Sequence, residues 1–204
     1  MNSASFKTVL DATVVITPSQ LNNDLYMNIK DNLEKRLIGK CYKNYGLIEK
    51  IYNIQKISDG KINQEDNDCN VYYNVSFHCR ILKPVVNSTI IAKVNSINND
   101  YIFLTSSNIK IIVTNKKIGN NYINDTINNT YKNKETNKVI ENGDFMKVNV
   151  LKYQLMDKEK NIYVEGSLVD EATDEEVDKF YNQLYTDIKE DDDYDDQTVI
   201  NDIL

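Results

Sequence analysis

The sequence predicts an α+β module, then an all-β barrel, then an acidic C-terminal tail. Three observations predict this order. Apolar residues recur at helical spacing near the N-terminus, and a strictly alternating strand follows. Beyond Pro84 the helical period disappears and several short strand patterns succeed one another. Acidic residues then gather at the C-terminal end.

The first element of the α+β module is a strand over residues 6–16, which are rich in β-branched side chains. Pro18 and Ser19 then mark the start of a helix. Gly39 ends that helix, because glycine readily adopts the left-handed conformation of a helix C-terminus. The apolar face of the predicted helix repeats every four residues and consists of Leu21, Leu25, Ile29, Leu33 and Leu37.

The strongest strand pattern runs from Cys69 to Ile81, where apolar and polar residues alternate without a break. Such alternation predicts a half-buried strand, with Cys69 and Cys79 as core thiols. Another strand, interrupted at residues 44–46, covers residues 41–57, and a turn follows at residues 58–60. We therefore expect one helix on an antiparallel sheet for residues 1–83.

The second domain is predicted over residues 84–170. Residues 116–142 are rich in asparagine and weakly patterned, so we interpret them as a long loop. Five strands with one long excursion before the fourth fit a small Greek-key barrel of the OB type. The predicted strands cover residues 89–97, 101–105, 109–114, 145–155 and 162–168.

Charge divides the chain unevenly. The net charge is −7 overall, but it is +5 over residues 1–169 and −12 over residues 170–204. The basic region, residues 1–169, could bind nucleic acid, whereas the acidic tail, residues 171–204, would repel it. Thr173 and Glu176 have the spacing of a capping box, which predicts a helix there. We expect its apolar face, Val177, Phe180, Leu184 and Ile188, to dock on a protein surface; the alternative is a disordered solubility tail.

The sequence offers little for catalysis. His78 is the single histidine, and no phosphate-binding or dinucleotide-binding glycine motif is present. The aspartates at residues 191–193 lack the glycine and distal glutamate of a calcium loop. No apolar stretch is long enough to span a membrane. We therefore expect a non-enzymatic protein without catalytic residues, metal or cofactor.

Basic and aromatic residues of the barrel point to nucleic acid. OB barrels bind single strands by stacking bases on aromatic rings and following the backbone with cations. The alternative is that the aromatic residues belong to the core and the lysines to an ordinary solvated surface. The candidates for RNA binding are Lys93, Tyr101, Phe103, Lys110, Lys116, Lys117, Lys147, Lys152 and Tyr153.

Three segments, in this order, resemble one known family. Residues 33–57 read LEKRLIGKCYKNYGLIEKIYNIQKI, residues 71–84 read VYYNVSFHCRILKP, and residues 164–170 read VEGSLVD. Together they resemble the stalk subunit of archaeal and eukaryotic RNA polymerases, the family of the seventh-largest subunit of RNA polymerase II. The resemblance covers residues 6–170. It departs from the family at Asn87 and Ser88, where a glycine is expected, and in the loop at residues 120–137.

The resemblance implies a non-catalytic polymerase subunit. Its tip module, residues 1–83, would dock on the large subunits near the clamp, through turns at Gly39, Tyr45, Gly46 and Gly60. At Gly46 and Gly60, glycine would allow a positive φ. The barrel would meet nascent single-stranded RNA, and whether a second stalk subunit takes part stays open.

Two further questions concern origin and rival functions. Asparagine, isoleucine, lysine and tyrosine have AT-rich codons, which indicates a large DNA virus or an AT-rich protist. The expected location is intracellular: host cytoplasm and virion for a virus, nucleus for a cell. The rival functions are a free-standing OB-fold protein that binds single-stranded RNA or acts in translation, and a purely structural assembly factor.

Overall fold

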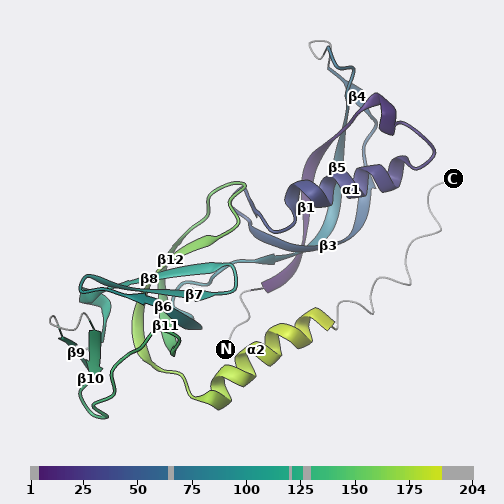
Figure 1. Ribbon diagram of the computed structural model, residues 1–204. Helices are drawn as coiled ribbons and strands as arrows, with labels where there is room; N and C mark the ends of the chain where they lie inside the picture. Colours follow the sequence, from purple (N-terminus) through teal and green to yellow (C-terminus); the bar gives the residue numbers. More distant parts are fainter. Residues whose placement is uncertain (1–4, 64–66, 120, 126–129, 190–204) are drawn as a thin grey trace. The chain divides into compact units, whose positions relative to one another are not determined.

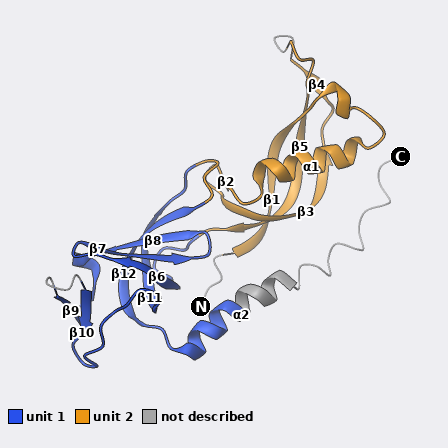
Figure 2. Ribbon diagram, viewed as in Figure 1, with its two compact units in different colours: residues 1–4, 84–156, 161–204 blue, residues 5–83, 157–160 orange. Residues whose placement is uncertain are grey.

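A computed structural model of the protein describes residues 5–63, 67–119, 121–125 and 130–189, except for the side chains of residues 183–189 (Figure 1). The chain divides into two compact units (Figure 2). The N-terminal unit consists of Ser5–Lys83 together with Asp157–Lys160. The barrel unit contains Pro84–Met156 and the chain from Asn161 onward.

The N-terminal unit is a helix on an antiparallel sheet, as the sequence predicts. Its strands β1 (Ser5–Ile16), β2 (Cys41–Tyr42), β3 (Gly46–Ile57) and β5 (Val71–Leu82) lie in the order β1-β5-β3-β2, and β4 (Lys61–Ile62) pairs with β5. The helix α1 (Leu25–Leu37) covers one face of this sheet (Figure 1). Its buried residues Ile29, Leu33 and Leu37 share a core with alternate residues of β1 and β5.

The helix begins one turn later than its apolar spacing suggests. Residues 18–20 form a short 3₁₀ turn, η1 (Pro18–Gln20), closed by a capping box between Thr17 and Gln20. The Asn28 side chain donates a hydrogen bond of 2.9 Å to the Gln20 carbonyl, which fixes this turn against α1. Leu21 is therefore outside the helix and 44% exposed, so its assignment to the apolar face was wrong.

The prediction for Cys69 was also wrong. β5 begins only at Val71, and Cys69 is exposed with a φ of +55°. Its conformation ends the alternating pattern, because a positive φ is incompatible with an extended strand. Cys79, in contrast, is buried, and burial raises the pKa of its thiol to about 12. Cys79 is therefore an unreactive core residue at neutral pH.

Both edges of the N-terminal sheet are partly covered. At the β1 edge, side chains of α1 and β2 donate to backbone carbonyls; the pairs are Tyr42 to Asp11, Arg36 to Thr13, and Asn32 to Val15. At the β2 edge, the Cys41 N–H donates to the Glu159 carbonyl (2.7 Å) and the Lys158 N–H to the Cys41 carbonyl (2.8 Å). These groups cannot pair with an added strand, which protects the sheet from edge-to-edge association.

The barrel unit is a closed five-stranded barrel. β6 (Thr89–Ile97), β7 (Tyr101–Ser106), β8 (Ile109–Thr114), β11 (Phe145–Gln154) and β12 (Ile162–Glu171) follow the order β11-β12-β8-β7-β6, and β6 pairs with β11 to close it. Only the β12–β8 pairing is parallel among these strands. The all-β barrel that the sequence predicts is therefore confirmed. Its interior includes Val94, Ile102, Leu104, Ile111, Val148 and Val164.

The segment after β8 is not the long loop that its composition indicates. It contains a 3₁₀ turn, η2 (Asn115–Lys117), and a hairpin of β9 (Tyr122–Asp125) and β10 (Thr130–Asn133). Tyr131 is 1% exposed, and its hydroxyl donates a 2.8 Å hydrogen bond to the Asn99 carbonyl. The buried tyrosines hold the hairpin, while the surrounding asparagines conceal its strand pattern in the sequence.

Candidate nucleic-acid and docking surfaces

Three strands of the barrel bring aromatic, aliphatic and basic side chains together on the outer surface. Successive side chains of a strand point to opposite faces, so the buried Ile102 and Leu104 leave Phe103 outside. Across the strands, Phe103 of β7 lies opposite Ile112 of β8. Lys110 of β8 lies opposite Tyr163 of β12. We name this surface, formed by Tyr101, Phe103, Lys110, Ile112 and Tyr163, the β7–β8 face.

The β7–β8 face is accessible in the barrel unit. Tyr101 is 39% exposed and Ile112 41%, and the other three side chains are half-buried. In OB folds, ligands commonly bind over the second and third strands, which are β7 and β8 in this barrel. Flat apolar and aromatic side chains beside a lysine can stack bases and contact a phosphate. The β7–β8 face therefore has the chemistry that a single-stranded nucleic acid requires.

Only three of the nine predicted RNA-binding residues lie on this face: Tyr101, Phe103 and Lys110. Lys147 forms an ion pair within the protein, because its ammonium lies 2.8 Å from a carboxylate oxygen of Glu176. Tyr153 pairs with the buried Val164 and so lies on the inner side of the sheet. The remaining four, Lys93 of β6, Lys116 and Lys117 of η2 and Lys152 of β11, are exposed on other parts of the unit.

Two members of the face, Ile112 and Tyr163, were missed from the sequence. The parallel pairing of β12 with β8 joins residues that are far apart in the chain. Alternation alone indicates that both side chains point outward. It could not show that Tyr163 lies beside Lys110, since that depends on barrel closure.

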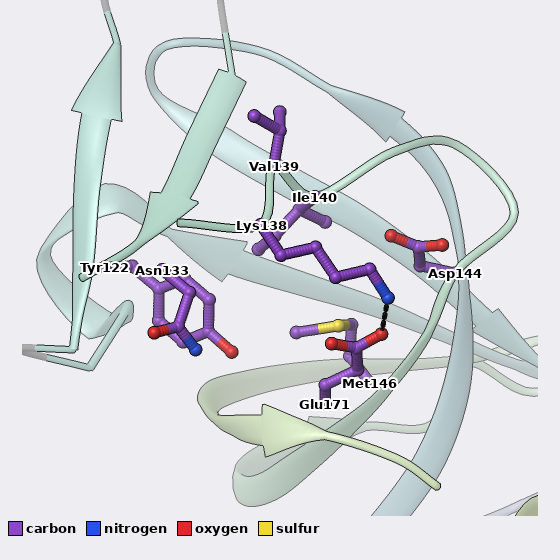
Figure 3. A pocket seen from close by; sticks show the side chains of 8 residues that line it. All are labelled: Tyr122, Asn133, Lys138, Val139, Ile140, Asp144, Met146 and Glu171. Carbon is purple, nitrogen blue, oxygen red and sulfur yellow. Dashed lines mark hydrogen bonds and ion pairs between the residues drawn. The ribbon is translucent and has the colours of Figure 1, made fainter. Parts of the chain in front are cut away.

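A small cavity lies where the β9–β10 hairpin meets the barrel (Figure 3). Lys138 crosses it to pair with Glu171, the last residue of β12. Tyr122 lines the cavity, and burial, followed by the Asp170 carboxylate, raises the pKa of its phenol to about 12. The cavity volume is about 10 Å³. That is room for a single water molecule, so this cavity is too small to bind a nucleotide or cofactor.

The four predicted docking residues do not form one cluster. Gly39, Tyr45 and Gly46 lie at the beginning of β3, where the Gly39 N–H donates to the Ile48 carbonyl (2.8 Å). Gly60 follows the other end of this strand. β3 has 12 residues. Such a strand is about 40 Å long, so the two groups of turns are separate.

Gly46, at the start of β3, and Gly60, after its end, are constrained to glycine by different local structures. Gly46 has a φ of +149°, and a Cβ there would lie 2.6 Å from the Leu82 carbonyl oxygen. Gly60 does not have the positive φ that its turn sequence suggests, so that expectation was wrong. A Cβ on Gly60 would instead lie 2.7 Å from Val71 and 2.9 Å from Tyr73. Both glycines allow close packing within the sheet.

Tyr45 is the one predicted docking residue that has a side chain, and this side chain is exposed. It is 46% exposed and stacks on Tyr42 with ring centroids 6.1 Å apart. The Lys43 ammonium lies 5.0 Å from the centroid of the Tyr42 ring. The Lys43 N–H donates a 2.8 Å hydrogen bond to the Asp157 carboxylate, which fixes this turn. Tyr42, Lys43 and Tyr45, named here the aromatic turn, form a compact aromatic and cationic surface.

Comparison with known proteins gives two matches. The SHS2 domain found in the N terminus of Rpb7p/Rpc25p/MJ0397 matches residues 12–68. The chain is also 28% identical over 180 residues to a protein of Acanthamoeba polyphaga mimivirus, provisionally named a DNA-directed RNA polymerase subunit. That alignment covers 88% of this chain and 89% of the relative. The chain is therefore similar to the N-terminal domain of Rpb7-type proteins and to a viral protein provisionally named as an RNA polymerase subunit.

The domain match spans all four predicted docking residues. Within the described part of the chain, no helix combines the length and apolarity needed to cross a bilayer. The same residues contain no group of three or more His, Cys, Asp or Glu side chains placed to hold a metal ion.

The acidic tail begins as a helix, α2 (Asp174–Lys189). The predicted capping box is present: the Thr173 N–H donates to the Glu176 carboxylate (3.0 Å), and the Glu176 N–H to the Thr173 hydroxyl (3.4 Å). Val177 and Phe180 of the predicted apolar face are half-buried. The side chains of Leu184 and Ile188 lie outside the described residues.

Proposed function

We propose that this protein is an Rpb7-like, non-catalytic stalk subunit of a DNA-dependent RNA polymerase. The N-terminal unit docks on the large polymerase subunits, and the barrel offers its β7–β8 face to nascent single-stranded RNA. The similarity of the N-terminal unit to the Rpb7-type domain and of the chain to the mimivirus protein supports the assignment to a polymerase. The joint placement of Tyr101, Phe103, Lys110, Ile112 and Tyr163 on one outer surface carries the assignment to RNA.

The expected RNA binding is weak and indifferent to sequence. Stacking on aromatic side chains tolerates every base, because each base has a π-face. The β7–β8 face has one lysine, Lys110, and residues 1–169 have a net charge of only +5. Few phosphate contacts imply modest affinity that falls as the salt concentration rises.

Replacing Phe103 with alanine tests the RNA assignment. We expect the affinity of the full chain for a fluorescent oligouridylate to fall by about 5- to 100-fold, since one stacked base contributes about 1–3 kcal/mol. The measurement is fluorescence anisotropy at low salt. Tyr45→Ala is the control, because Tyr45 is an exposed aromatic residue of the N-terminal unit and should leave RNA affinity unchanged.

Two outcomes of this titration contradict the proposal in different ways. Normal binding by the Phe103→Ala variant would place the RNA elsewhere on the barrel. Failure of the unmodified full chain to bind at low salt would remove RNA contact altogether.

A pull-down through the full chain tests the stalk assignment. We expect mass spectrometry to find large polymerase subunits in stoichiometric amounts. We also expect the Lys43→Ala/Tyr45→Ala variant to recover less of them, because it removes the exposed aromatic turn. A chain that migrates alone and holds RNA by itself would instead support a free-standing OB-fold protein.

The cellular location follows from the same reasoning. Similarity to a mimivirus protein supports a viral subunit that works in the host cytoplasm and is packaged in the virion. Mass spectrometry of purified particles checks this expectation, and absence of the chain from the particles would contradict packaging.

A further inference from the structure

The acidic tail makes specific contacts with the barrel where it leaves β12. The Ala172 N–H donates to the Phe145 carbonyl (2.9 Å) and extends the pairing of β12 with β11 by one hydrogen bond. Glu171 pairs with Lys138. The capping box at Thr173 then sets the direction in which α2 begins. The chain therefore enters α2 in a defined geometry.

The first turns of α2 lie against β11. The Glu176 carboxylate lies 2.8 Å from the Lys147 ammonium, and this ion pair lowers the pKa of Glu176 to about 2. Tyr181 meets the Phe145 ring edge-on, with centroids 6.0 Å apart. The pair of carboxylates Glu171 and Glu176, with their partners Lys138 and Lys147, is named here the tail contact.

The tail contact brings a large opposite charge to the barrel. Residues 170–204 have a net charge of −12, against +5 for the preceding residues. β12 alone separates β11 from β8 in the barrel. Lys147 lies opposite Asp170 of β12 and Lys110 lies opposite Tyr163, so the tail contact and Lys110 are about 23 Å apart along β12. That is more than two Debye lengths at physiological salt, so the tail contact acts by occupying Lys138 and Lys147, which a single strand several nucleotides long can reach from the β7–β8 face.

We propose that the acidic tail is a built-in competitor of single-stranded RNA, held on the barrel by the tail contact. Nucleic acids gain affinity by neutralising their phosphates with protein cations. A covalently attached polyanion is present at high effective concentration, so it occupies those cations first. The tail thereby lowers the affinity of the barrel for RNA. This inference rests on the proposed binding of RNA by the barrel.

Two full-chain variants with the same change in net charge test the inference. Glu171→Gln/Glu176→Gln removes both ion pairs and keeps a residue that can complete the capping box. Glu175→Gln/Asp178→Asn, the matched control, neutralises two exposed residues of α2. We expect the first variant to bind a fluorescent oligouridylate about 3- to 10-fold more tightly than wild type at 50 mM NaCl, and the control about twofold at most. At 500 mM NaCl the difference should vanish.

A second measurement does not depend on RNA. Acetylation of Lys147 by a water-soluble reagent, followed by mass spectrometry, should be slow in wild type and control and fast in the Glu171→Gln/Glu176→Gln variant. Equal RNA affinities of the two variants would overturn the inference while leaving RNA binding intact, and so would equal acetylation of Lys147 in all three proteins. If no protein binds RNA at either salt concentration, the proposed function itself fails, and the inference fails with it.

Discussion

Replacing Gly166 with valine is expected to destabilise the barrel unit strongly. Gly166 is buried in β12, and a Cβ there would lie 2.3 Å from Val148 Cγ1 and 3.3 Å from Ile111 Cγ2. Val148 and Ile111 are both fully buried, so neither side chain can move into solvent. Overpacking of a core costs about 1–3 kcal/mol or more, and valine adds three carbons at this point. Thermal unfolding followed by circular dichroism should show a Tm at least about 6 °C lower.

Gly119→Ala provides the matched control for this prediction. A Cβ on Gly119 would lie 3.4 Å from the Leu168 carbonyl oxygen, which is ordinary van der Waals contact. We expect its Tm to remain within about 2 °C of wild type, as for most surface substitutions. A Gly166→Val variant as stable as this control would mean that the barrel interior is packed differently.

The Gly46→Val variant is expected to lose co-purification with the large polymerase subunits. Valine would need a φ of +149° and would place its Cβ 2.6 Å from the Leu82 carbonyl oxygen. β3 must then separate from β5 at Leu47 and Leu82, beside the aromatic turn. The barrel has its own core, so RNA affinity in the anisotropy titration should be unchanged. Pull-down and titration together therefore separate lost docking from general unfolding.

Gly39→Ala is the control for the docking prediction. Gly39 has a φ of +73°, but a Cβ on it would meet no atom within 4 Å. Alanine in the left-handed region costs about 1–2 kcal/mol and leaves the packing of β3 on β5 untouched. We expect this variant to recover clearly more of the large subunits than Gly46→Val does. Stoichiometric recovery of the large subunits with Gly46→Val would show that docking does not depend on this end of β3.

Local periodicity explains which elements could be predicted from the sequence. α1 and β5 have regular apolar spacing. In such an element, the position of a residue within the repeat indicates whether its side chain faces the core or the solvent. The start of α1 and the conformation of Cys69 were missed, because η1 and a positive φ interrupt the pattern. The β9–β10 hairpin was missed because its burial depends on Tyr122 and Tyr131 contacting other segments.

The sequence by itself determined the order of the two units, the acidic tail and the resemblance to the polymerase subunit family. These properties follow from local patterns and from short motifs. Only the tertiary structure decided which barrel residues share a surface. Tyr163 lies beside Lys110 because β12 pairs with β8, and Lys147 is occupied because α2 returns to β11. Both contacts join distant parts of the chain, and their register is set by closure of the barrel, which no local pattern encodes.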